Sequence, residues 1–174
     1  MRAPRVYLAG KIAKNDWRHI LVPNLRAHIW ADGPIHTKAF SYVGPFFVSC
    51  DHGCNHSPGS HGASAPVECG QRQFTREEII ANNNAALESA DLVFGYITDT
   101  DCYGTLIEIG CALSRGIRVV LAFAPNIPQD DFWYASMQTA AVHTEVRLCC
   151  LPSLLADELA AWALSVTPIR KDQR

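Results

Sequence analysis

Two short apolar runs, one helix length apart, constrain the fold of this chain more than any other feature. Leu92 to Ile97 and Ile117 to Phe123 are rich in β-forming residues and lack a polar face, which is typical of parallel strands covered by helices on both sides. Between them, apolar residues recur at helical spacing from Leu106 to Leu113, and Gly116 ends that stretch. The pattern predicts a strand, a helix and a second strand of a parallel α/β sheet.

The rest of the chain continues this alternation. Thr75 to Glu78 has the pattern of a capping box, which predicts the start of a helix that leads to the strand at Leu92. We also expect strands at 5–9 and 146–150, and helices at 15–29 (interrupted by Pro23), 130–141 and 153–164. Residues 1–174 should therefore form a single domain, a Rossmann-like three-layer α/β sandwich with about five parallel strands.

The composition argues against several classes of protein. The 174 residues are 48% hydrophobic and carry a net charge of -2, as expected for one globular domain of ordinary polarity. There is no basic stripe for nucleic acid and no apolar run long enough to cross a bilayer, so we expect neither as a partner. The charged start of the chain does not resemble a signal peptide, which favours a cytoplasmic protein. Seven cysteines, an odd number, indicate reduced thiols or metal ligands rather than a disulfide framework.

Residues 31–74 are expected to form an irregular insertion with one β-prone run, Tyr42 to Ser49. The insertion is rich in cysteine and histidine, which are zinc ligands, and a closed tetrahedral site would order a long loop. The candidate zinc ligands are Cys50, Cys54, His56 and Cys69. The spacing fits no standard zinc finger, so two alternatives stay open: histidines that bind substrate, or a loop that covers the active site with its cysteines buried.

Glu108 is the residue that this arrangement singles out for chemistry. It lies one turn into the helix that follows the strand at Leu92 to Ile97, and ligands bind beyond the carboxyl ends of strands in open α/β sheets. Its sequence neighbours are apolar, and an ionised carboxylate among them is costly unless it is partnered or does chemistry. Glu108 could equally complement the helix dipole on a solvated face, and spacing alone leaves both readings open.

The same stretch resembles the nucleoside 2-deoxyribosyltransferase superfamily, which includes the 2'-deoxynucleoside 5'-phosphate N-hydrolases and the CMP hydrolases. The shared features are a strand, an aspartate-rich loop, Gly-Thr-x-x-Glu-x-Gly from Gly104 to Gly110, and Tyr-Leu-Ala-Gly-Lys-Ile at residues 7–12. In that family the glutamate of the motif attacks C1' of the sugar, and Glu108 is the matching position. The resemblance implies cleavage of the N-glycosidic bond of a nucleoside or a nucleoside 5'-monophosphate.

A substrate site around Glu108 follows from this resemblance. In the family the sugar and phosphate lie against the first loop; there Gly10 would let the backbone approach a ligand, and Lys11 and Lys14 would supply positive charge. Both lysines could instead be merely solvated. The expected substrate-binding residues are Tyr7, Gly10, Lys11, Ile12, Asn83, Asp99, Cys102, Gly104, Thr105 and Asn126.

The expected catalytic residues are Glu108, Asp101 and Tyr103. An ionised Glu108 can stabilise an oxocarbenium-like transition state and then trap C1' as a covalent glycosyl-enzyme. Asp99 and Asp101 are candidates to hold Glu108 or to protonate the departing base, and Tyr103 could hydrogen-bond near the nucleophile. No cofactor is expected for catalysis.

Two positions depart from the family pattern. Cys102 stands where the transferases have aspartate and the phosphate-selecting hydrolases have serine, and Asn83 replaces an acidic residue that contacts the base. Loss of that acid weakens the proton relay that base exchange requires, which favours hydrolysis of a nucleotide over deoxyribosyl transfer. The alternative from another class is a nucleotide-binding sensor without turnover.

Aromatic residues after the strand at Ile117 to Phe123 predict a homo-oligomer. Phe132, Trp133 and Tyr134 present more aromatic surface than a small domain readily buries, and the family builds its sites across subunit contacts. We expect at least a dimer in which this helix or the 50–69 loop covers a neighbour's site. These rings could otherwise belong to the core or stack on a nucleobase.

Purified protein should carry about one zinc per chain if cysteine and histidine coordination orders residues 50–69. Elemental analysis of the purified protein measures this ratio. Metal-free protein with an undiminished melting temperature and all thiols titratable would return the loop to a substrate-binding or covering role.

Overall fold

The computed structural model describes residues 2–12, 17–23, 25, 33–45, 75–140, 145–147, 157 and 159–161. The strands are β1 (Arg5–Ala9), β2 (Ile35–His36), β3 (Ser41–Gly44), β4 (Leu92–Ile97), β5 (Arg118–Phe123) and β6 (Glu145–Arg147). The helices are α1 (Arg18–Leu21), α2 (Arg76–Ser89), α3 (Tyr103–Ser114), the 3-10 helix η6 (Gln129–Phe132) and α4 (Trp133–Ala140).

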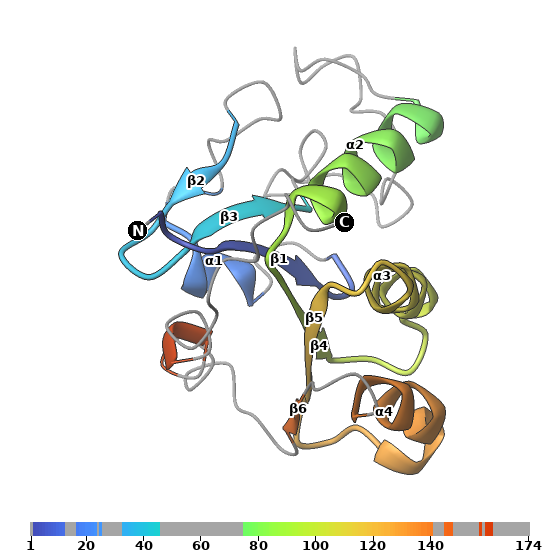
Figure 1. Cartoon of the computed structure of the whole chain (residues 1–174). Coiled ribbons are helices and arrows are strands. Elements are labelled where there is room, and N and C mark those ends of the chain that lie inside the picture. Colours follow the sequence, from blue (N-terminus) through green and yellow to red (C-terminus); the bar gives the residue numbers. More distant parts are fainter. Residues whose placement is uncertain are drawn as a thin grey trace, which may run out of the picture.

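The six strands form one sheet in the order β2, β3, β1, β4, β5, β6. β2 runs antiparallel to β3, and every other neighbouring pair is parallel. α2, α3 and α4 lie on one side of the sheet and α1 on the other (Figure 1). The expected three-layer Rossmann-like α/β fold, with β3, β1, β4, β5 and β6 as its five parallel strands, is therefore confirmed.

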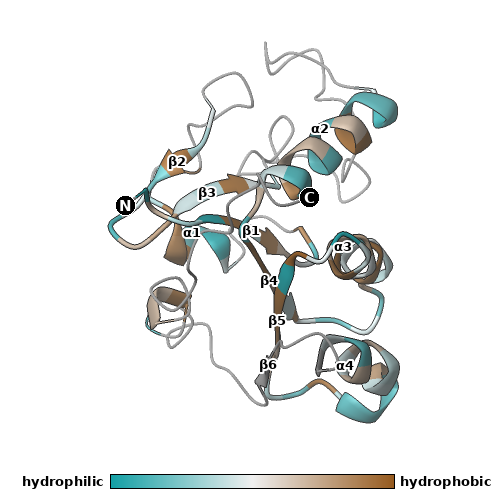
Figure 2. Ribbon diagram, viewed as in Figure 1, coloured by the Kyte–Doolittle hydropathy of each residue, from teal (hydrophilic) through white to brown (hydrophobic). Residues whose placement is uncertain are grey.

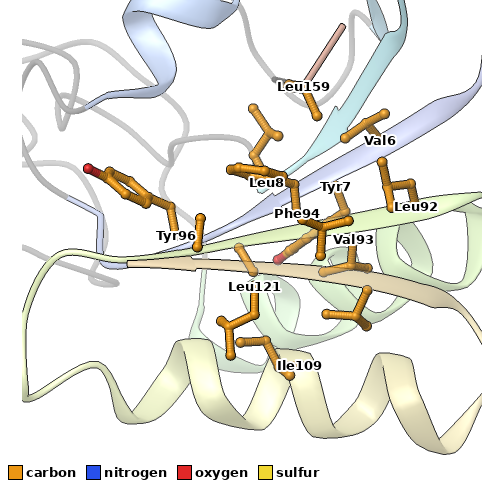
Figure 3. Packing of buried hydrophobic residues seen from close by; sticks show 14 of the residues in the cluster. Val6, Tyr7, Leu8, Leu92, Val93, Phe94, Tyr96, Ile109, Leu121 and Leu159 are labelled. Carbon is orange, nitrogen blue, oxygen red and sulfur yellow. The ribbon is translucent and has the colours of Figure 1, made fainter. Parts of the chain in front are cut away.

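The central strands are apolar because helices cover both of their faces. Every residue of β4 is buried, as are all of β1 and β5 except the arginines at their starts. Figure 2 shows hydrophobic residues along β4 and hydrophilic ones at the outer end of α2. Figure 3 shows Ile109 of α3 on one side of these strands, and Leu8, Tyr96 and Leu159 on the other.

Two helix boundaries follow the sequence signals closely. α2 begins at the expected capping box: Glu78 N donates to Thr75 Oγ1 at 3.2 Å, and Thr75 N donates to Glu78 Oε2 at 2.9 Å. Gly116 follows α3 with a φ of 66°, a left-handed conformation that ends a helix without strain only at glycine. None of the helices in the described ranges is long and apolar enough to cross a membrane.

Elsewhere the boundaries differ from the sequence prediction. The helix expected over 15–29 is interrupted at Pro23 as predicted: α1 has four residues and ends at Leu21, because Val22 precedes Pro23 and takes an extended conformation. Residues 15, 16, 24 and 26–29 lie outside the described residues. The strand expected at Tyr42 to Ser49 is β3, which ends at Gly44, and β2 was not predicted. β3 pairs with β1, so this part of the segment expected as an insertion belongs to the sheet.

The order of the strands creates a crevice between β1 and β4. From β1 the chain goes to β3 on one side, and it then crosses to β4, β5 and β6 on the other. Ala9 at the end of β1 lies opposite Gly95 of β4, so the loops after both strands leave the same edge of the sheet. Ligands bind at such reversal points because the loops on either side diverge there.

Gly44 allows β3, β1 and α2 to approach one another. Its φ is 150°, and a Cβ at this position would lie 3.1 Å from both Ala86 Cβ and Tyr7 Cε2. We expect Gly44→Ala to lower the free energy of unfolding by about 1–3 kcal/mol, because both the backbone strain and the crowding oppose it. Urea denaturation measures the difference.

Gly110→Ala is the matched control. Gly110 lies inside α3, and a Cβ there would meet nothing within 4 Å. Since alanine favours a helix over glycine by about 1 kcal/mol, this variant should be as stable as the wild type or slightly more so. Equal losses in both variants would refute the role of Gly44.

Candidate active site

A cavity of about 450 Å³ opens at the crevice between β1 and β4. It lies between the loop after β1 and the start of α3, and its size is typical of small-molecule sites. The described residues that line it are Gly10, Lys11, Ile12, Asp101, Cys102, Gly104, Thr105 and Glu108. All eight were expected at the site, most of them from the resemblance to the deoxyribosyltransferase superfamily, and they meet here because the carboxyl ends of neighbouring parallel strands lie at one edge of the sheet.

Glu108 is held by Tyr7. The Tyr7 hydroxyl donates a hydrogen bond to Glu108 Oε1 at 2.5 Å. Tyr7 lies in the middle of β1 and is fully buried, and its side chain points to the face of the sheet that α3 covers. The sequence placed Tyr7 among the substrate-binding residues, whereas the structure makes it the partner of the expected nucleophile.

Burial controls the protonation of both groups. Desolvation raises the pKa of Glu108 to about 7, although the hydrogen bond from Tyr7 and the charge of Arg18 act in the opposite direction. Burial, followed by the charge of Glu108, raises the pKa of Tyr7 well above its usual value. Tyr7 therefore stays protonated and remains a donor, while Glu108 can gain or lose its proton near neutral pH.

Arg18 is a buried cation beneath the cavity. It is 0% exposed, and its Nε donates to Leu8 O at 2.8 Å while Nη2 donates to Gly10 O at 2.6 Å. A longer bond joins Nη1 to Lys11 O at 3.4 Å, and the guanidinium lies 4.7 Å from the centre of the Trp17 ring. Arg18 thus fixes the backbone of the loop that forms one wall of the cavity.

Sequence reasoning did not identify Arg18. The available signal was its spacing, because Leu21, Val22 and Leu25 follow it at three, four and seven residues and all are buried. Gly10 makes room for this side chain: a Cβ there would lie 3.0 Å from Arg18 Nη2 and 3.0 Å from Trp17 Cζ2. The close approach at Gly10 is therefore to Arg18 and Trp17, whereas a close approach to a ligand had been expected.

Three charged side chains form the rim of the cavity. Lys11 Nζ bonds Asp101 Oδ1 at 2.5 Å and Asp99 Oδ2 at 3.2 Å, joining the loop after β1 to the loop after β4. The bond to Asp101 raises the pKa of Lys11, and the same bond lowers the pKa of Asp101. Asp99 and Asp101 were candidates to hold Glu108, but the structure pairs them with Lys11.

The remaining candidates lie in different environments. Tyr103, expected beside the nucleophile, is 71% exposed at the start of α3, and Tyr7 provides the hydroxyl at Glu108 instead. Cys102 is buried at the cavity wall, where burial raises the pKa of its thiol. Asn126 is exposed after β5. Asn83 lies in α2, and its buried Oδ1 has no hydrogen-bond partner among the described residues.

The expected zinc ligands Cys50, Cys54, His56 and Cys69 lie outside the described residues, as does Lys14. Within the described ranges, no group of three or more histidine, cysteine, aspartate or glutamate side chains could hold a metal ion. The zinc site is therefore still a prediction from the sequence.

A second cavity, of about 470 Å³, lies between α3 and the segment formed by η6 and α4. Its lining is mainly apolar, with Leu106, Ile109 and Leu113 on α3 facing Phe132 and Ala135. Glu108 does not line it. The titratable groups that chemistry needs gather at the first cavity, so we assign the candidate active site there.

Comparison with models of known protein families gives no match, and no curated protein matches the sequence at a significant level. The resemblance to the deoxyribosyltransferase superfamily therefore depends on the motif positions around Glu108 and on the first loop.

The raised pKa of Glu108 predicts how stability depends on pH. Its pKa is about 7 in the folded chain against an ordinary value of 4.5, so the folded state binds this proton more tightly. The tighter binding of the Glu108 proton contributes fully to the free energy of unfolding below about pH 4.5, and this contribution is lost as the pH rises to 7. Glu108→Gln cannot ionise, and it should be more stable than the wild type by about 3 kcal/mol at pH 8 and nearly equal to it at pH 4.

Chemical denaturation of both proteins between pH 4 and pH 8 measures this difference. Glu88→Gln, which removes a carboxylate with a 63% exposed side chain from the surface of α2, is the control and should show no such gain. A difference between wild type and Glu108→Gln that does not change with pH would contradict the prediction.

Proposed function

We propose that this protein cleaves the N-glycosidic bond of a nucleoside or nucleotide, with Glu108 as the nucleophile. The observation that carries the proposal is the desolvated Glu108 carboxylate at the cavity, held by Tyr7 at 2.5 Å. A carboxylate in a small-molecule cavity with a pKa near neutrality suits covalent catalysis, since it can ionise at working pH and is poorly solvated.

The chemistry follows from the charge that develops during bond cleavage. As the bond from C1' to the base nitrogen breaks, its electron pair leaves with the base, and positive charge spreads over C1' and the ring oxygen. Ionised Glu108 stabilises this charge and then bonds to C1', forming a glycosyl-enzyme that water hydrolyses or a second base intercepts. Tyr7 occupies Oε1, which leaves Oε2 as the oxygen that reaches C1'.

The leaving base needs a proton, and the rim limits its source. Lys11 lowers the pKa of Asp101, so this carboxyl is ionised at neutral pH and is a poor acid. We therefore reassign Asp101 from proton donor to partner of Lys11. Solvent that enters the cavity mouth can protonate the base, which is compatible with the hydrolysis that we favour.

We further propose that the protein works in the cytoplasm as a homo-oligomer and needs no catalytic cofactor. Trp133, Tyr134 and Met137 on α4 are each at least 60% exposed, and Tyr103 and Ile107 on α3 are 71% and 67% exposed. Exposed apolar surface of this kind favours contact with a second subunit. Because Tyr103 adjoins Gly104 in the cavity wall, such a contact would lie beside the active site.

Glu108→Gln should reduce base release by at least about 10³-fold, because the variant keeps the side-chain volume but loses the nucleophile. Chromatography of free base released from a panel of ribo- and deoxynucleosides, with and without 5'-phosphate, measures the rate. A variant that keeps a tenth of the activity would exclude Glu108 as nucleophile. Absence of base from every substrate with the wild type would leave the sensor function.

The pH dependence of the rate identifies Glu108 independently. Activity of the wild type should rise with pH through about 7, as Glu108 ionises. Tyr7→Phe removes the hydrogen bond that lowers this pKa, so its activity should rise at a higher pH. An unshifted profile in Tyr7→Phe would show that another group controls the rate.

A further inference from the structure

Lys11 is the one cationic side chain among the described residues that line the cavity. Its Nζ bonds two carboxylates, Asp101 at 2.5 Å and Asp99 at 3.2 Å, whose side chains are 57% and 51% exposed. The three groups together carry one positive and two negative charges. Lys11, one of the two cations that the sequence suggested for a phosphate, is therefore already outnumbered by anions.

We infer that this site takes nucleosides and discriminates against nucleoside 5'-phosphates, with Asp101 as the residue that determines this preference. The inference depends on the proposed function and narrows its substrate. It also reverses the sequence-based preference for a nucleotide with Lys11 or Lys14 near its phosphate; Lys14 lies outside the described residues.

The distances explain the discrimination. A phosphate oxygen that bonds Lys11 Nζ at about 3 Å would lie within about 6 Å of both carboxylate oxygens, since these are 2.5 Å and 3.2 Å from the same nitrogen. Exposed ion pairs are weak, so a phosphate could displace one carboxylate from Lys11. The displaced carboxylate and its neighbour would then repel the dianion at short range.

Within the part of the chain that the structure describes, the other charges near the cavity do not compensate. Glu108 adds negative charge when it ionises, and Arg18 lies beneath the loop with its guanidinium bonded to the carbonyl oxygens of Leu8 and Gly10. An uncharged sugar avoids this repulsion, and its hydroxyl groups can donate hydrogen bonds to the rim carboxylates. The same negative charge favours the positive charge that forms on the sugar during cleavage.

The experiment compares one 2'-deoxynucleoside with its 5'-monophosphate, using kcat/KM for base release. We expect the wild type to prefer the nucleoside by at least about 10-fold, and Asp101→Asn to shift the ratio toward the monophosphate by about 10-fold, because Lys11 then faces one carboxylate. Asp130→Asn, which removes an exposed carboxylate outside the cavity lining, is the control and should leave the ratio unchanged. High salt should narrow the wild-type preference, since screening weakens charge repulsion but not steric exclusion.

Binding to Glu108→Gln separates this inference from the proposed function. Calorimetric titration of the inactive variant with the same two ligands should show tighter binding of the nucleoside, and Glu108→Gln combined with Asp101→Asn should reduce that difference. If the wild type prefers the monophosphate, or if Asp101→Asn and Asp130→Asn have the same ratio of kcat/KM for the two substrates, the inference fails while the proposed function stands. If neither ligand binds and the wild type releases no base, the proposed function fails.

Discussion

The candidate active site depends on one partly buried hydrogen bond, from the Tyr7 hydroxyl to Glu108. It joins the central strand β1 to α3, so the helix that carries the carboxylate is positioned against the sheet by the same contact that orients it. Removing a carboxylate from water is costly, and the raised pKa of Glu108 reflects that cost. The chain holds this group in place because Tyr7, itself desolvated, keeps its proton and donates a hydrogen bond to the carboxylate. At neutral pH the fold is less stable with an ionisable carboxylate at this position than it would be with an uncharged side chain. Such a loss of stability is common where a site holds a charged group that is poorly solvated.

The charged side chains around the cavity fall into a buried group and an exposed group. Arg18 lies below, where it bonds the carbonyl oxygens of the first loop, and its charge favours the ionised form of Glu108. Above it, Lys11 joins two loops through Asp99 and Asp101 and leaves the rim acidic. Under the proposed function, this arrangement suits a neutral substrate that becomes positive during the reaction better than a substrate that carries a phosphate. The position of Arg18 also explains the glycine at position 10, since Arg18 and Trp17 occupy the space that a side chain there would need.

Local signals predicted much of this fold. β4, α3, β5 and the capping box of α2 were read correctly because each depends on periodicity or capping within a few residues. β2 and the true extent of β3 were not, since a two-residue strand is defined by its pairing partner and not by its own composition. The helix expected after β1 is interrupted before Pro23, as the proline predicted, and α1 is shorter than the expected segment on that side. The eight residues that line the cavity were predicted mainly from the resemblance around Gly104 to Gly110 and residues 7–12, and the strand order brings these two loops together.

The sequence by itself determined that Glu108 would lie one turn into a helix at the carboxyl edge of a parallel sheet, because short-range patterns specify both elements and their connection. Only the tertiary structure decided what Glu108 contacts and how it ionises. Its partner Tyr7 is 101 residues away along the chain, and Lys11 is 90 residues from Asp101. Desolvation arises only when β1, β4 and α3 pack together, so a pKa and a charge balance are properties of the assembled fold and cannot be read from spacing.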